Sequence, residues 1–327
     1  MDRTRQHKRR RYWVAGTLLL AAVLTDTVAW ALACHRLETG IRESSVAAGW
    51  TLSAHASHWA GWPTAAAIVL EDATARTDAA ILAPLTWTAP RATLSLSAWH
   101  PTRLTVSASG AQSLAFAADP PVAFTARSLL ALIDLTARDP ARITAAALEV
   151  AAPSGPITIA AATLLLQPDA FAADLSGLGL TGPAFQPIPP IDAVRLDGQI
   201  SPPIIPKATA SASAQAWRAS GGKLQLDLLS LRWGALAATG HATLMLDPAL
   251  QPAVTGQITA TGLATVTDQL AQSGAITRTA ATAAQAILAI LAAPARGGPV
   301  TLPITVQDGT VIVARIPLLR LAPLVWD

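Results

Sequence analysis

The sequence predicts a mainly β protein: a long, curled antiparallel sheet, open as a half-barrel or trough, with an N-terminal transmembrane helix and one or two helices in the C-terminal half. Three observations predict this fold class. A basic run is followed by a single apolar stretch long enough to cross a bilayer. Beyond residue 50, apolar and polar residues alternate with a period of two, which is typical of strands with one buried face. Residues 263–293 interrupt this alternation with an Ala-, Leu- and Gln-rich stretch that favours helix.

A membrane-spanning helix is expected over residues 13–34, because at about 1.5 Å per residue they cover the roughly 30 Å hydrocarbon core of a bilayer. Residues 1–12 form a basic tail with six Arg or Lys, which predicts a cytoplasmic N-terminus. Trp13 and Trp30 lie near the two ends of the helix, where interfacial aromatic residues are common. Residues 50–327 are then expected to form a β-rich domain beyond the membrane, which in a bacterium would be the periplasmic side of the inner membrane.

A cleaved signal peptide is the alternative for the same segment. An apolar stretch of suitable length precedes residues 31–33 (ALA), which fit a small-x-small cleavage site. Asp26 shortens the apolar run and would cost about 2.5 to 3.5 kcal/mol at the centre of a bilayer. The uncleaved anchor is favoured because helical spacing continues through Leu37 and Ile41, which predicts a helical continuation over residues 35–49.

The clearest strands are three segments in which every second residue is apolar. The residues that share the apolar face are Leu94 and Leu96, Leu104 and Val106, and Leu224 and Leu226. The last alternation slips by one at Leu229, which predicts a β-bulge. Further strands are expected over residues 65–71, 142–150, 156–166, 192–200, 241–247 and 254–261. The opposite face carries Ser, Thr and Ala rather than Lys and Glu, so we expect it to be wet but nearly uncharged.

Turn and loop residues mark the remaining boundaries. Asp308-Gly309 predicts a two-residue hairpin turn with positive φ between two C-terminal strands. The helical segment is expected to part near Ser273-Gly274. Pro-rich residues 187–193 and 201–207 indicate loops or the starts of edge strands. Because no fixed-period repeat is found, we expect one continuous sheet rather than two independent domains.

The distribution of charge argues against nucleic-acid binding. The pI of about 9.6 arises from the N-terminal tail, since residues 35–327 contain 17 basic and 18 acidic residues. The whole chain has three Lys, so the domain lacks the basic face that phosphate binding needs. The single cysteine, Cys34, also excludes an intramolecular disulfide.

Two motifs resemble sites but lack the context that their chemistry requires. Residues 177–182 (GLGLTG) match the dinucleotide pattern GxGxxG, but Pro183 follows where a phosphate-binding helix would begin, so a loop is expected. His55 and His58 are three residues apart, which on a strand places them on opposite faces. No third ligand lies near them in the sequence, and no nucleophile or carboxylate pair stands out. We therefore assign no catalytic, cofactor or metal residue.

Residues 54–63 (AHASHWAGWP) are interpreted instead as the junction between the N-terminal helix and the first strand. Gly61 frees the backbone, and Pro63 fixes φ where a strand can begin without donating a hydrogen bond. Trp59 and Trp62 are expected to cover the end of an apolar sheet, so Trp62→Ala should destabilise the fold.

A family resemblance rests on Trp, Gly and Pro landmarks. Residues 37–50 (LETGIRESSVAAGW, ending at Trp50), the GWP at 61–63 and residues 86–114 resemble the domain-of-unknown-function 2125 family of exported bacterial proteins. Residues 231–263 and 302–326 are similar to the ends of AsmA-like envelope proteins. The resemblance implies an inner-membrane-anchored periplasmic β-rich protein, and the AsmA-like similarity implies a role with lipids or in outer-membrane biogenesis. It carries over no catalytic residues.

We expect a non-enzymatic protein whose sheet presents an apolar face to a lipid or another amphiphile during envelope maintenance. The six alternating Leu and Val residues named above are the candidate lining, and the alternative is that they pack against helices as an ordinary core. A second function class is an interaction scaffold, in which a sheet edge or the apolar residues 316–326 bind an envelope protein. A hydrolase is the third class, with no motif in its favour.

Overall fold

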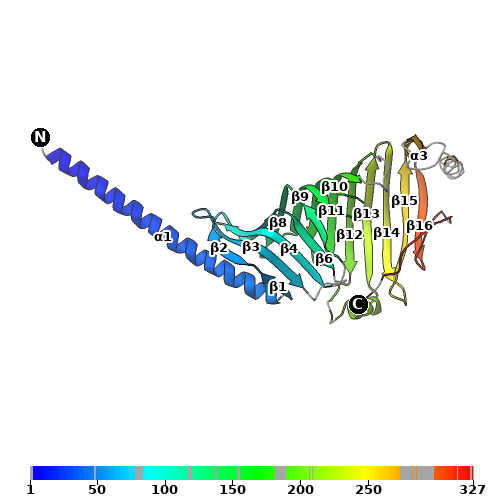
Figure 1. Ribbon diagram of the computed structural model, residues 1–327, viewed down its shortest axis with the longest axis horizontal. Helices are drawn as coiled ribbons and strands as arrows, with labels where there is room; N and C mark the ends of the chain where they lie inside the picture. The colour runs from blue at the N-terminus through cyan, green and yellow to red at the C-terminus, as the bar shows by residue number, and fades with distance from the viewer. Residues whose placement is uncertain are drawn as a thin grey trace.

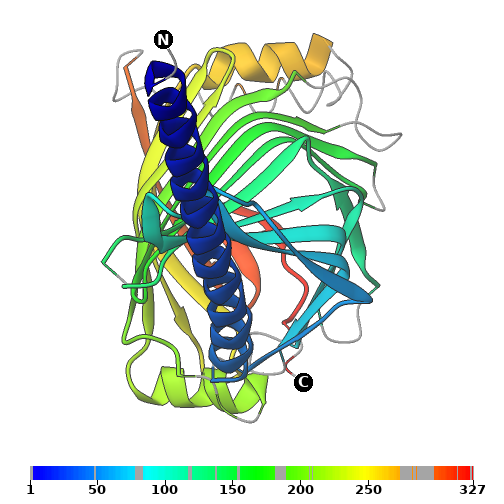
Figure 2. The same cartoon turned by 90° about the vertical axis from the view of Figure 1, so that its left-hand side faces the viewer.

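The structure is a computed structural model that describes residues 3–47, 49–77, 84–116, 120–136, 138–152, 155–180, 189–205, 207, 209–272, 282, 285, 298–314, 316–324 and 326. Its longest element is the helix α1 (Arg3–Ala47), whose first half extends away from the rest of the molecule (Figure 1). Two short helices follow within the β-rich part, α2 (Ala210–Ala219) and α3 (Leu263–Gln272), and they lie at opposite rims of the sheet (Figure 2).

The described residues form eighteen strands in one sheet. The first nine are β1 (Trp50–Ser53), β2 (Ala56–Ala60), β3 (Ala65–Thr77), β4 (Leu85–Ser97), β5 (His100–Ser109), β6 (Gln112–Phe116), β7 (Val122–Thr125), β8 (Ser128–Asp134) and β9 (Ala141–Val150). The others are β10 (Ile157–Leu166), β11 (Ala170–Leu180), β12 (Ile191–Ser201), β13 (Lys223–Trp233), β14 (Leu236–Leu246), β15 (Pro252–Thr261), β16 (Val300–Gln307), β17 (Thr310–Val313) and β18 (Ile316–Arg320).

The strands pair antiparallel with their neighbours, and from β9 to β18 they follow chain order. At one end of the sheet β1 and β2 both pair with β3, and at the other end β18 pairs with β17. No pairing in the described part joins these two ends, so the sheet curls into a partial ring that stays open (Figure 2). The predicted fold class, an open curled antiparallel sheet with an N-terminal apolar helix, is confirmed.

Between β4 and β9 the sheet splits into two branches, one formed by β5 and β8 and the other by β6 and β7. The second half of β4 pairs with β5 and the first half with β6, while β9 pairs with β8 and then with β7. The bend in β4 falls at Pro90, which lies opposite Asp72, a residue with a φ of +51°. Gly110, between β5 and β6, has a φ of +88°, and a Cβ at this position would lie 3.1 Å from the Pro90 side chain. A residue with positive φ interrupts the ladder of its strand and turns the strand. Asp72, Pro90 and Gly110 are neighbours across the strands, so the bends form one crease.

The same crease continues into β9, β10 and β11. Ala147 has a φ of +48°, and the ladders on both sides of Ala160 skip one residue at this level. Gly177 has a φ of +61°, and a Cβ there would lie 2.7 Å from the Cβ of Ala160, so the close approach of β10 and β11 requires glycine. This explains part of the GLGLTG motif. Residues 177–180 are in strand β11, so the predicted loop is wrong for them, and residues 181–182 lie outside the described residues.

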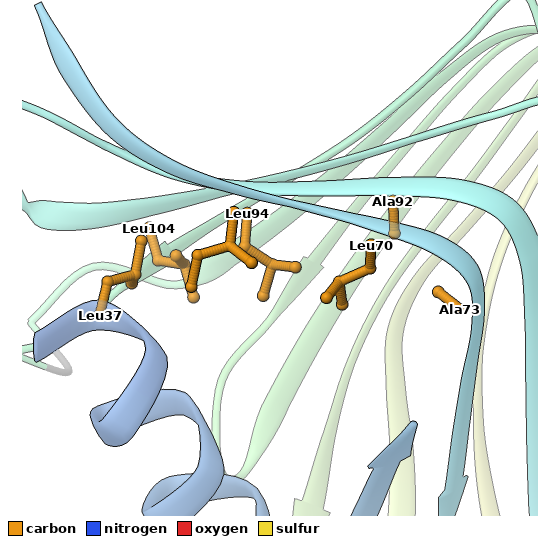
Figure 3. Close-up of a cluster of buried hydrophobic side chains, with 7 residues drawn as sticks. Leu37, Leu70, Ala73, Ala92, Leu94 and Leu104 are labelled. Atoms are coloured by element: carbon orange, nitrogen blue, oxygen red, sulfur yellow. The ribbon is translucent and has the colours of Figure 1, made fainter. Parts of the chain in front are cut away.

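The main hydrophobic core lies where the second half of α1 crosses β3, β4 and β5 (Figure 3). Leu37 of α1 is 6% exposed and packs with Leu70, Leu94 and Leu104 of the sheet. Nearer the N-terminus, the Trp30 indole N–H donates to the Ala65 carbonyl at 2.9 Å. The sheet thus holds α1 from Trp30 onward.

One helix in the described part is long and apolar enough to cross a membrane, the stretch of α1 that begins at Leu20. A signal sequence near the N-terminus would pass the same criterion, so length and composition do not separate the two interpretations.

Several local predictions can be compared directly with the structure. Gln307 pairs with Thr310 across Asp308-Gly309, whose φ values of +52° and +70° confirm the predicted hairpin turn. The bulge in β13 is confirmed, since its ladder to β14 shifts between Leu226 and Leu229. The second part of the predicted helical segment lies outside the described residues apart from Thr282 and Gln285.

The interpretation of residues 54–63 as the junction after the helix is wrong, although the role of Gly61 in the turn is as expected. The chain leaves α1 at Gly49 and enters β1 at Trp50, whereas residues 54–63 contain β2 and the turn into β3. Gly61 has a φ of +90° and accepts the amides of Thr64 and Ala65 in this turn. Local sequence marks a turn here but does not say which two elements it joins.

Candidate functional site

The inner face of the curled sheet carries an unbroken row of apolar residues that pair across twelve strands. We call it the inner row: Ile68, Leu94, Val106, Ala131, Ile143, Leu164, Ala173, Leu196, Leu229, Gly240, Ile258 and Leu302. Each residue is the direct cross-strand partner of the next, so their side chains share one face. The inner row lies on the face that contacts Leu37 of α1.

The adjacent residues on the opposite face are mostly polar. We call them the outer row: Val69, Thr93, Ser107, Leu130, Thr144, Thr163, Asp174, Arg195, Ser230, Thr239, Thr259 and Thr301. Its two charged members form a long ion pair, with 4.0 Å between Arg195 Nε and Asp174 Oδ1. The apolar side of this sheet is its concave side, since Leu70, Leu94 and Leu104 lie on the inner side of the curved strands, toward α1 (Figure 3). The outer face of Ser and Thr can be hydrated.

The inner row is buried only beneath α1. Ile68 and Leu94 are 4% and 8% exposed, because Leu37 and Ile41 of α1 pack over this part of the sheet. From Val106 to Leu302 every member is partly exposed. Near β15, Ile258 packs against a small core formed by Leu236, Ala260 and Val266 of α3, yet it is still partly exposed. Among the described residues, no member of the inner row beyond α1 is fully buried, so most of this face remains accessible.

A cavity of about 270 Å³ lies at the rim of the concave face next to α2. Its lining is apolar and comes from α2, four strands and the C-terminal segment: Ile200, Ile204, Ala214, Trp217, Leu224, Leu244, Leu246, Pro252, Leu324 and Trp326. The indole N–H of Trp217 donates to the Pro202 carbonyl at 2.9 Å, and that of Trp326 donates to the Leu250 carbonyl at 2.9 Å. Since both indole groups already have partners, the rings can present apolar surface to the cavity.

Besides the Trp326 bond to Leu250, the side chain of Gln251 holds the C-terminal segment against this cavity. Gln251 donates from Nε2 to the Leu324 carbonyl at 3.0 Å and accepts the Leu324 amide on Oε1 at 2.8 Å. The side-chain amide thereby pairs with the backbone as a neighbouring strand would. Residues 316–326 are the predicted docking segment for a partner. Their described part consists of β18 and the residues that follow it, of which Leu324 and Trp326 form hydrogen bonds with Gln251 and Leu250 of the same chain.

A second cavity, of about 430 Å³, lies between the end of α1 and the strands β1 and β2. Its floor includes Ile68, Leu70 and Leu94, and its rim includes Glu38 and Arg42, which form an ion pair at 2.8 Å. A polar rim above an apolar floor suits a molecule with a polar head and an apolar tail.

Of the six predicted lining residues, some lie in the core beneath α1 and others lie at or near the cavity beside α2. Leu94 and Leu104 are buried in the core beneath α1, and Leu96 and Val106 are partly buried against the same core. Leu224 lines the cavity beside α2, and Leu226 is partly exposed on the same face. Sequence reasoning missed Trp217, Gln251 and Leu324. Trp217 lies in a helix that the Ala- and Ser-rich sequence signals only weakly, with Thr209 as its N-cap.

The histidine pair lies on β2 and just before it. His58 is the cross-strand partner of Val69 of the outer row, whereas His55 precedes β2 and lines the cavity beside α1. Among the residues that the structure describes, no three His, Cys, Asp or Glu side chains gather in a group able to hold a metal. The strongest perturbation of an acid is outside both cavities: hydrogen bonds from the Thr136 amide and hydroxyl and from the amides of Asp139 and Arg138 lower the pKa of Asp134 from 3.8 to about 2.

The comparisons with known proteins agree with the family resemblance. Residues 30–322 match the family model DUF2125, described as an uncharacterized protein conserved in bacteria. No curated protein and no solved structure matches the chain. The expected relation to AsmA-like envelope proteins is not shown by these comparisons. Because the match covers nearly the whole curled sheet and the docked part of α1, the chain belongs to the DUF2125 family.

Proposed function

We propose that the protein is a membrane-anchored, non-enzymatic binder of a lipid or another amphiphile, whose hydrocarbon chain lies along the inner row. One observation carries this proposal: the inner row is apolar in all twelve strands yet remains partly exposed beyond α1. An uncovered apolar face of this length is costly in water, and a bound hydrocarbon chain would remove the cost.

The energetics suit a chain without specific polar chemistry. Each methylene moved from water onto the inner face contributes about 0.8 kcal/mol. The open rims leave space for a polar head, and the cavity beside α2 would hold the most deeply buried part of a chain. The proposed role is therefore to bind or guide an amphiphile, not to cleave it.

The proposed location follows from α1. Its apolar stretch would anchor the chain in the bacterial inner membrane, with the basic tail in the cytoplasm and the sheet in the periplasm. The cavity beside α1 begins at Glu38, about two helical turns beyond Trp30, so it would lie close to the membrane surface.

The test is site-specific photo-crosslinking of the full chain in cell membranes. A photoreactive benzoylphenylalanine replaces Ile258 of the inner row in one variant and its exposed neighbour Gln257, which points to the outer face, in the other. After irradiation, mass spectrometry of the purified protein should show lipid adducts at position 258 and none at position 257. Equal labelling at the two positions, or none at position 258, would overturn the proposal.

A scaffold function is the second candidate, and the free edge of β18 favours it. In the described part of the chain β18 pairs on one side only, with β17, so its outer side can accept a strand from an envelope protein. The same photoreactive residue placed at Leu321, next to this edge, should then give a protein adduct that a proline at Leu319 abolishes. Lipid adducts at position 258 should be unaffected by that proline.

A further inference from the structure

We propose that three exposed tryptophans beside the anchor form a second contact with the bilayer. We call Trp59, Trp62 and Trp99 the tryptophan rim. The inference rests on the proposed membrane anchor but not on amphiphile binding by the inner row. It would place this end of the sheet directly on the membrane surface.

The rim is unusually exposed for its residue type. Trp59 is 41% exposed, Trp62 is 49% exposed and Trp99 is 81% exposed. Tryptophan is highly buried on average in soluble proteins, and clustered exposed aromatic residues mark interaction surfaces. This exposure also corrects the prediction for Trp62, whose ring contributes surface rather than core.

Hydrogen bonding holds the rim together across two turns. Trp62 lies in the turn between β2 and β3, and Trp99 lies in the turn between β4 and β5. The Ala98 amide donates to the Thr64 carbonyl at 3.0 Å, so the two turns lie side by side. Trp59 precedes the first turn and packs edge-on against Trp30 of α1, with 6.2 Å between the ring centroids.

The contact with α1 sets the depth of the rim relative to a membrane. Trp30 donates to Ala65, at the start of β3, which fixes the β2–β3 turn beside this level of the helix; Figure 1 shows β2 and β3 beside the second half of α1. The 17 residues from Trp13 to Ala29 cover about 26 Å of helix, close to the roughly 30 Å hydrocarbon thickness. Trp30 and the rim would therefore lie at the outer interface, where tryptophan is enriched.

The chemistry of the two turns suits the lipid headgroup region. Residues 59–66 and 96–102 contain no Asp, Glu, Lys or Arg, and His100 is their one titratable side chain. The nearby acid, Glu38, accepts from the Trp59 indole N–H at 3.3 Å from a position two helical turns farther from the membrane. Glu38 is also paired with Arg42 at 2.8 Å, and the two turns themselves carry no carboxylate that would oppose insertion of their apolar rings and polar N–H groups.

The test uses the full chain in vesicles of phosphatidylethanolamine and phosphatidylglycerol. The variant Thr64→Cys carries an environment-sensitive fluorophore between the two rim turns, and Thr239→Cys on the outer row of β14 is the matched control. The buried Cys34 is fully enclosed, so it should not react. We expect blue-shifted emission and loss of quenching by iodide at position 64, and full quenching at position 239.

A second variant separates the rim from the anchor. Trp62→Ala with Trp99→Ala should change the unfolding temperature little, because Trp62 is 49% exposed and Trp99 is 81% exposed, and should restore iodide quenching at position 64. Full quenching at position 64 in the otherwise unchanged chain would overturn the proposal. Protection that persists in detergent and rises with protein concentration would assign the rim to a second copy and overturn it too. Lipid adducts at Ile258 are independent of these outcomes.

Discussion

At the end of the sheet beneath α1, Ile68 and Leu94 are 4% and 8% exposed, whereas Leu229 and Ile258 in the same inner row remain partly exposed toward the other end. The alternation of residues along the strands is the same at both ends. What differs is the extent of the cover: Leu37 and Ile41 of α1 fill one end, whereas at the other end Ile258 packs against the small core beneath α3 without full burial, and a cavity of about 270 Å³ lies beside α2.

The two ends show that a sheet can have an apolar face without having a buried core. Strand alternation places apolar side chains on one side, but a second element must bury them before they contribute their full free energy to folding. Where no such element lies over the face, the same side chains remain available to a ligand.

The largest difference between the two ends is expected when one leucine at each end is replaced by alanine. Leu94→Ala removes a fully packed side chain and should lower the free energy of unfolding by about 2 to 5 kcal/mol. Leu229→Ala, in the same row but partly exposed, should cost about 1 kcal/mol or less. Denaturant unfolding of both full-length variants in one detergent measures the two costs. Equal losses would mean that the far end is a filled core and would contradict an open inner face.

Removal of the Gln251 side chain, which holds the C-terminal segment, should change hydrogen exchange only at the α2 end of the sheet. Gln251→Ala deletes two hydrogen bonds to Leu324, each with a net contribution of about 1 kcal/mol. Amide hydrogen exchange of residues 321–324 should become faster, while exchange in β3 and β4 stays unchanged. Gln257→Ala, on the exposed outer face of the same region, is the control and should leave both unchanged. Unaltered exchange near Leu324 would show that Trp326 alone holds the segment.

A smaller, pH-dependent effect is expected at the turn after β8, between the two ends. Because hydrogen bonds lower the pKa of Asp134 from 3.8 to about 2 in the folded protein, its stabilising effect is complete above about pH 4 and is lost as the pH falls toward 2. Asp134→Asn should therefore lower the unfolding temperature slightly at pH 6, and the difference from the unmodified protein should shrink below pH 4. A difference that is constant from pH 6 to pH 2 would contradict this assignment.

The smallest effect is expected from the histidines beside the covered end. His55→Gln with His58→Gln should leave the unfolding temperature and lipid adducts at position 258 unchanged, because no other described His, Cys, Asp or Glu joins the two in a group able to hold a metal. Metal analysis of the purified full chain provides the second readout. Metal that is present before the double substitution and absent after it would show that the pair has a role.

Much of the sheet was predictable from the sequence because its signals are local. The segment 223–233 coincides with β13, and the Asp308-Gly309 turn and the bulge before Leu229 follow from adjacent residues. By contrast, α2 was missed because Ala and Ser beside a Pro-rich loop give a weak helical signal, and its Trp217 is buried only through contacts with distant strands.

The alternation that makes one face of the strands apolar and the other rich in Ser and Thr can be read from neighbouring residues, because the side-chain period of a strand is a local property. Where that face is covered, how the crease through Gly177 curls it and which tryptophans stay exposed become visible only in the folded protein. Those features depend on contacts between segments far apart in the chain, such as Trp30 with Ala65 and Gln251 with Leu324, which no local pattern specifies.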